Sequence, residues 1–142
     1  MIDWMFEVLT AFKMSEQTFF LAVQYMDRYI AATPVALELE QLHIIGITCM
    51  FLASKFEDIT PLFMQTVVAR IGHHRFSREA ILHQEKLILG TLCFKMAAVP
   101  TVLEFLQRYL THAYLAAYPL RGGVQTLTTV SKYLACLQSH HI

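Results

Sequence analysis

Charged residues are scarce in this sequence, and those present cancel. Only 15% of the 142 residues are charged, and eleven basic residues balance eleven acidic ones. No basic stripe stands out, so we expect no binding to duplex nucleic acid through phosphate neutralisation. Hydrophobic residues make up 56% of the chain, which is too apolar for disorder, and some of that surface is expected to meet a partner.

Cysteine is also rare, and the few cysteines are isolated. Cys49, Cys93 and Cys136 are odd in number and lie inside apolar runs. This pattern favours a reducing compartment and core packing over disulfides or metal. Asp3 and Glu7 interrupt the N-terminus and no cleavage site follows, so no signal peptide is predicted. We therefore expect a soluble intracellular protein.

Motifs for catalysis and for cofactors are missing as well. The sequence has no Gly-rich phosphate loop, no HExxH and no GxSxG. The pairs His73-His74 and His140-His141 have no Cys or carboxylate at ligand spacing, so no metal is expected. Cys93 has no histidine partner in a recognisable arrangement, and apolar neighbours raise a thiol's pKa. We therefore expect neither an enzyme nor a cofactor.

Long apolar helical patterns are abundant, above all between Glu38 and Asp58. Residues 42–53 are almost all apolar, so no face of a helix here is left polar. Such a helix either spans a membrane or lies at the centre of a bundle. Leu42–Ser54 is shorter than the roughly 20 residues that a bilayer span needs. The sequence therefore predicts a buried central helix and no membrane span.

Further helical patterns lie on both sides of the central one. The predicted helices cover residues 1–13, 15–32, 38–58, 61–71, 77–92, 101–118 and 124–140. Ser15 and Ser77 are the expected N-caps, and Pro34 and Gly72 the expected ends. The first helix should bury one face, formed by Ile2, Met5, Leu9 and Phe12. No strand-like alternation of useful length occurs, so the predicted fold class is all-α.

Two charges fall on apolar helix faces, where a lone charge would be costly. Lys55 extends the apolar line of the central helix through Phe51, and Glu85 lies between Ile81 and Leu89 on the fifth. Two interpretations stand side by side. Lys55 and Glu85 either satisfy one another between neighbouring helices, or present a donor and an acceptor to another protein.

Four further positions are candidates for binding a peptide: Trp4, Glu7, Leu42 and His43. Helix geometry alone does not place these four residues on one surface. A Trp on a helix usually belongs to the core. A half-exposed Trp beside an acidic residue would instead anchor a peptide.

Several segments together resemble the cyclin box, in order and at near-family spacing: IDWMFEV, TFFLAVQYMDRYI, LHIIGITCMFLASKFEDITP, FSREAILHQEKLILGTLCF and PTVLEFLQRYL. LASKFED and YMDRYI are the specific ones, and the pattern is similar to mitotic, A/B-type cyclins. The resemblance implies a five-helix bundle with a buried third helix, plus the first two helices of a second, incomplete cyclin repeat. The implied domains are residues 1–95, an N-terminal cyclin box, and residues 96–142, a partial C-terminal repeat.

The function implied by the resemblance is that of a regulatory cyclin. Such a protein binds and allosterically activates a cyclin-dependent protein kinase in cell-cycle control, in nucleus and cytoplasm, and helps to dock substrates. By position, the kinase-binding residues are Lys55, Glu85, Leu52, Phe56, Leu89 and Met96. The docking patch for RxL-type substrate or inhibitor peptides resembles Trp4, Glu7, Leu42 and His43, with His43 where a Gln is usual.

Departures from the family pattern leave alternatives open. The chain begins at the end of the MRxIL motif, whose Arg normally pairs with the acid at position 27, so Asp27 needs Arg28, a helix end or water. A second repeat of two helices would leave apolar faces uncovered, which predicts self-association or a missing partner. The alternatives are an adaptor that binds a transcription complex, and a truncated cyclin that binds a kinase without activating it.

Overall fold

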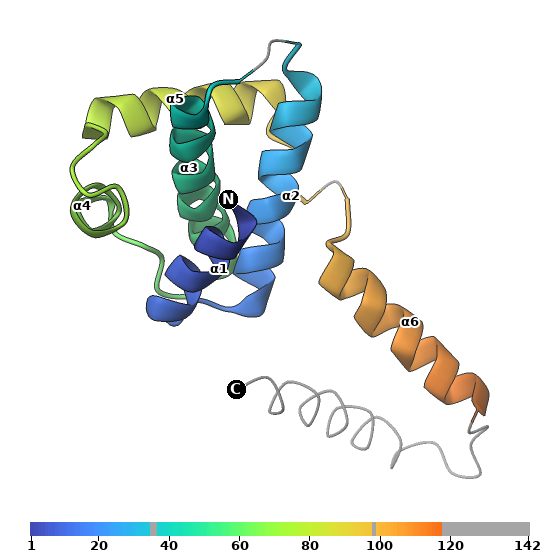
Figure 1. Ribbon diagram of the computed structural model, residues 1–142. Coiled ribbons are helices and arrows are strands. Elements are labelled where there is room, and N and C mark those ends of the chain that lie inside the picture. The colour runs from blue at the N-terminus through green and yellow to red at the C-terminus, as the bar shows by residue number, and fades with distance from the viewer. Residues whose placement is uncertain (35–36, 98, 118–142) are drawn as a thin grey trace. The chain divides into compact units, whose positions relative to one another are not determined.

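The computed structural model describes residues 1–34, 37–97 and 99–117 (Figure 1). Its elements are α1 (Ile2–Ala11), α2 (Glu16–Ala32), α3 (Leu39–Glu57), α4 (Met64–Thr66), the π-helical turn η1 (Val67–Ile71), α5 (Arg78–Thr91) and α6 (Val102–Ala117). All regular structure within these ranges is helical, which confirms the predicted all-α class.

Helix α3 is the buried centre of the bundle. Every residue from Ile45 to Ser54 is buried. The helices α1, α2 and α5 and the turn η1 pack against it, and Figure 1 shows them around it. At its N-terminal end, Gln41 Oε1 accepts a hydrogen bond from the Glu38 backbone N–H at 2.9 Å. Burial on all sides confirms the prediction made from the absence of a polar face.

Side-chain caps start α2 and α5 at the predicted residues. Ser15 Oγ accepts from the Thr18 N–H, and Ser77 Oγ accepts from the Ala80 N–H, each at 3.1 Å. The buried Thr18 Oγ1 also donates to Asp58 Oδ2 at 2.7 Å. Because Asp58 is the C-cap of α3, this bond joins the start of α2 to the end of the central helix.

Two helix predictions need correction. In α1 Met5 and Leu9 are buried, but Ile2 is exposed because it lies in the first turn of the helix, at the edge of the packed face. The fourth helix begins at Met64 instead of Pro61, because the Leu62 N–H donates to the buried Ser54 Oγ at 2.6 Å. That tertiary hydrogen bond takes the place of a first helical turn.

The π-helical turn η1 ends at Gly72, as predicted. The Gly72 N–H donates to the Val67 carbonyl at 2.8 Å, five residues back. A Cβ on Gly72 would lie 3.2 Å from that oxygen and 3.3 Å from the Val68 oxygen. These two carbonyl oxygens lie closer than most Cβ contacts, so a side chain at position 72 would crowd the end of η1.

The cysteines differ in their surroundings, and one prediction is wrong. Cys49 is buried in α3, and this burial raises the pKa of its thiol, with a smaller contribution from Asp27. Cys93 is exposed, contrary to the expected core position. Cys93 and Phe94 adopt left-handed φ angles of 51° and 56° in the turn that follows α5, and both residues are exposed there. Cys136 lies outside the described residues.

The chain divides into two compact units after Thr101. Helix α6 belongs to the second unit and carries exposed apolar side chains, among them Phe105 and Tyr109. The helix predicted at 124–140 lies outside the described residues. The domain boundary between residues 95 and 96 stays a prediction. No helix in the described ranges is long and apolar enough to cross a membrane.

Candidate functional site

Helices α3 and α5 bring Lys55 and Glu85 together. Lys55 Nζ forms an ion pair and a hydrogen bond with Glu85 Oε1. The Lys55 side chain is 38% exposed and that of Glu85 10%. Lys55 Nζ also lies 4.1 Å from the centre of the Phe51 ring, which adds a cation–π attraction. The two charges are thus paired with one another, and the Lys55 side chain remains partly accessible to solvent.

The apolar residues predicted around this pair differ in accessibility. Leu52 is buried, and Leu89 and Met96 are partly buried against the core. Phe56 is 52% exposed and offers most of the apolar surface. The loop after α3 adds two exposed apolar residues that sequence reasoning missed, Ile59 and Phe63. Their only sequence signal was their position after the ASKFED segment.

Side chains of α2 hold the segment that follows α5. Gln24 Nε2 donates to the carbonyls of Val99 and Pro100, at 3.1 and 3.0 Å. Arg28 donates to the Lys95 carbonyl at 2.9 Å, so its hydrogen bond goes to this segment instead of Asp27, which is exposed. Gln24 was not selected from the sequence, and Arg28 was considered only as a partner for Asp27. Gln24 and Arg28 fix the backbone on either side of Met96.

The structure unites three of the four candidate docking residues. The rings of Trp4 and His43 meet edge-on, with centroids 4.6 Å apart. Trp4 and Glu7 line a cleft of about 310 Å³ between α1 and η1. Its other lining residues are Val8, Ala11, Phe12, Arg70, Ile71 and His73. Leu42 is partly buried and is not among the lining residues.

Two basic residues, Arg70 and His73, line this cleft together with Glu7, and sequence reasoning did not anticipate them. Arg70 shares the cleft with Glu7, and its guanidinium carbon lies 4.9 Å from the Phe12 ring centre. Burial, followed by the charges of Arg75 and His73, lowers the pKa of His43 below its ordinary value of 6.5. His43 is therefore neutral near pH 7, with one ring nitrogen donating and the other accepting.

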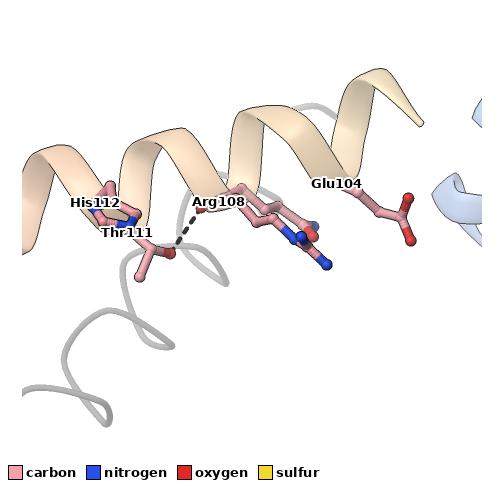
Figure 2. A pocket seen from close by; sticks show the side chains of 5 residues that line it. Glu104, Arg108, Thr111 and His112 are labelled. Atoms are coloured by element: carbon pink, nitrogen blue, oxygen red, sulfur yellow. Dashed lines mark hydrogen bonds between the residues drawn. The ribbon is translucent and has the colours of Figure 1, made fainter. Parts of the chain in front are cut away.

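A separate hollow of about 520 Å³ runs along α6 (Figure 2). It is lined by Glu104, Gln107, Arg108, Thr111 and His112. Thr111 Oγ1 donates back to the Gln107 carbonyl at 2.7 Å, within the same helix. In the part of the chain that the structure describes, no three His, Cys, Asp or Glu side chains gather in a way that could hold a metal ion.

These features define an all-helical bundle that carries the Lys55–Glu85 ion pair on α3 and α5 and a Trp4-lined cleft between α1 and η1. Residues 1–97 match the family described as "Cyclin, N-terminal domain". The chain belongs to the cyclin family.

Curated relatives agree with the predicted A/B-type resemblance. The chain is 34% identical to Cyclin-A2 of Gallus gallus over 143 residues, which covers 98% of this chain and 35% of that protein. It is 37% identical to the G2/mitotic-specific cyclin-A of Hydra viridissima, covering 83% and 29%. For the G2/mitotic-specific cyclin-B of Emericella nidulans the identity is 38%, covering 76% and 22%. The chain thus spans about a third or less of the length of these relatives.

Proposed function

We propose that this chain binds a cyclin-dependent protein kinase and activates it allosterically in cell-cycle control. The observation that carries the proposal is the Lys55–Glu85 pair, held on adjoining helices beside the exposed Phe56. An ammonium with free donors and a carboxylate with free acceptors suit the backbone groups of an incoming helix or loop. The catalytic groups would all belong to the kinase, and the chain itself is not an enzyme.

Activation follows from preferential binding to one kinase state. Lys55 and Glu85 would contact the backbone around the kinase C-helix, while Phe56, Leu89 and Met96 supply the apolar surface and Leu52 supports it from within. The favoured kinase state pairs the C-helix Glu with the ATP-site Lys and withdraws the activation loop. Such a complex would act in nucleus and cytoplasm.

The Trp4 cleft is proposed to dock RxL-type substrate or inhibitor peptides. The peptide's Leu would enter beside Trp4 and its cation would face Glu7, with Leu42 and His43 at the edge. Arg70 and His73 line the same cleft. They would repel a second basic residue of the peptide and so restrict the positions at which the peptide can carry one. The Trp4–His43 ring contact supports this use, because it holds the Trp side chain in one orientation.

Calorimetry of the full chain with a purified cyclin-dependent kinase tests kinase binding. Lys55→Ala and Glu85→Ala should each weaken binding by roughly 2–5 kcal/mol, since the remaining charge becomes buried and unpaired in the complex. Glu40→Ala is the matched control, because it removes an exposed acid whose 4.0 Å contact with Arg75 lies elsewhere. Unchanged affinity of both folded variants would refute the proposal.

Phosphorylation of a histone-type substrate, measured with the same samples, tests activation. Tight binding without stimulated phosphorylation would overturn the activation half and favour a module that binds without activating. Trp4→Ala should leave stimulation of a plain substrate intact and reduce the use of RxL-bearing substrates. Equal loss of both would assign Trp4 to the core.

Self-association through the second unit is a further part of the proposal. Phe105 and Tyr109 of α6 are both more than half exposed, which is costly for apolar side chains in water. Sedimentation of the full chain should therefore reveal dimers or larger species. A monomer at every concentration would contradict this expectation.

A further inference from the structure

A second cleft lies between the α4–η1 segment and the start of α5. It measures about 380 Å³ and is lined by Met64, Gln65, Val68, Ala69, His74 and Arg78. Met64, Val68 and Ala69 make its apolar part, whereas His74 and Arg78 are exposed beside it. Acidic side chains are absent from its lining. This cleft shares no lining residue with the Trp4 cleft.

The segment that supplies the basic edge of this cleft is rich in arginine and histidine. Residues 70–78, RIGHHRFSR, contain three arginines and two histidines without an acidic residue, and all five basic side chains are exposed. Among the ion pairs between described residues, only Arg75 in this run has a partner, Glu40 at 4.0 Å. The net charge of zero for the whole chain therefore conceals a local basic surface.

Helix stability does not explain the placement of Arg78. It is the first residue of α5, where the helix dipole is positive and an acidic residue is favoured. A cation there opposes the helix dipole. Residues that contradict local preference in this way often serve a function.

The backbone also fixes His74 at the edge of the cleft. Its φ angle is 58°, a left-handed conformation that few residues other than glycine adopt. The His74 N–H donates to the Val68 carbonyl at 3.0 Å, which ties this strained residue to the cleft's apolar part. The basic edge and the apolar part are thus held together by one short segment.

We propose that this second cleft docks an acidic segment of a partner protein. An apolar side chain of that segment would sit on Met64 and Val68, and its carboxylates would face Arg78 and His74. Charge complementarity favours this occupant, since every ionisable group that lines the cleft is basic. Duplex nucleic acid suits it less, because the basic surface is short and the cleft is half apolar. The inference goes beyond kinase activation and RxL docking.

The two clefts would then differ in charge, because of the two only the Trp4 cleft is lined by an acidic residue. Glu7 offers a carboxylate beside Arg70 and His73 in the Trp4 cleft, whereas the ionisable groups that line the second cleft are all basic. One partner with a basic docking motif and a separate acidic stretch could engage both. The position of its acidic stretch would then contribute to selectivity between partners.

Fluorescence polarisation with the full chain tests the proposal. The probe is a labelled twelve-residue peptide of Glu, Asp, Leu and Phe, compared with a counterpart carrying Lys at every acidic position. The acidic peptide should bind and the Lys peptide should not compete for its site. Arg78→Glu should weaken binding about tenfold, and adding His74→Asp should weaken it further.

The variants are chosen so that the fold survives. Glu at position 78 agrees with the helix dipole, and Asp tolerates the left-handed conformation at position 74. Arg70→Glu, on the Trp4 cleft, is the matched control and should change the affinity less than about twofold. Each variant should still melt in one cooperative transition, and its kinase affinity should match that of the unmodified chain.

Several results would overturn the assignment. One is no acidic-peptide binding at about 1 mM, the limit of a meaningful docking affinity. Another is an equal effect of Arg70→Glu, which would indicate diffuse electrostatics in place of a defined site. A third is displacement of the bound acidic peptide by a lower concentration of an RNA oligonucleotide or of anionic vesicles. That competitor would then be assigned as the ligand of the cleft in place of an acidic protein segment.

Discussion

Replacing Gly46 by valine should loosen α1 from α3 and shift Trp4. Gly46 lies in the buried part of α3, where the two helices come close. A Cβ on this residue would lie 3.2 Å from Met1 Sδ, and 3.8 Å from both Met5 Sδ and Trp4 Cζ3. The size of the residue at position 46 therefore sets how near α1 can approach.

Alanine and valine at this position should have opposite effects. Gly46→Ala crowds only the Met1 sulfur, the end of a flexible side chain that is 40% exposed and can move. Its better helix propensity contributes about 1 kcal/mol, so the free energy of unfolding should stay equal or rise. Compared with alanine, valine at position 46 adds two more carbons near Trp4 and the fully buried Met5. Overpacking of this kind costs about 1–3 kcal/mol.

Urea unfolding followed by the fluorescence of Trp4, the only Trp in the chain, measures both variants. Gly46→Val should lower the unfolding free energy, alter the native emission of Trp4 and weaken RxL-peptide binding. Kinase binding should stay within about a factor of two, because Lys55 and Glu85 lie beyond the strained contact. A valine variant as stable as the alanine one, with unchanged emission, would show that the close approach of α1 and α3 is wrong.

Three other predictions concern named side chains. Thr18→Val removes the buried hydrogen bond to Asp58 and should cost about 1.5–3 kcal/mol in urea unfolding; no loss would mean that the bond is not stabilising. Because the pKa of His43 is lowered in the folded chain, its unfolded form binds protons more readily, so stability should fall as the pH drops below 6.5. His43→Gln should remove this part of the pH dependence in thermal melts, and an identical slope would contradict the assignment. Iodoacetamide should modify Cys93 well before the buried Cys49, whose thiol pKa is raised; equal rates in peptide mapping would count against that difference.

Local signals predicted most of the bundle. The all-round apolar character of α3 and the caps at Ser15 and Ser77 depend on residues close in sequence, so they could be read without tertiary contacts. The start of the fourth helix could not, because Pro61 looks like a first helical residue, and only the bond from Leu62 to Ser54 displaces it. The exposure of Cys93 likewise depends on backbone angles that an apolar run does not reveal.

The candidate sites were less accessible to sequence reasoning. Periodicity placed Lys55 and Glu85 on apolar faces, but only the packing of α3 on α5 decides that they meet, and the family resemblance suggested a role for them. Arg70 and Arg78 escaped notice because a sum over the whole chain hides a local concentration of charge. Their grouping is visible in residues 70–78 once the charge is counted segment by segment.

The unbroken burial of α3 has a mechanical consequence. His43 near its beginning and Lys55 near its end are separated by about 18 Å along the axis, at 1.5 Å per residue. Because every residue from Ile45 to Ser54 is buried, this part of α3 can neither bend nor slide without opening the core. Under the proposed function, α3 keeps a docked substrate at a constant distance from the bound kinase.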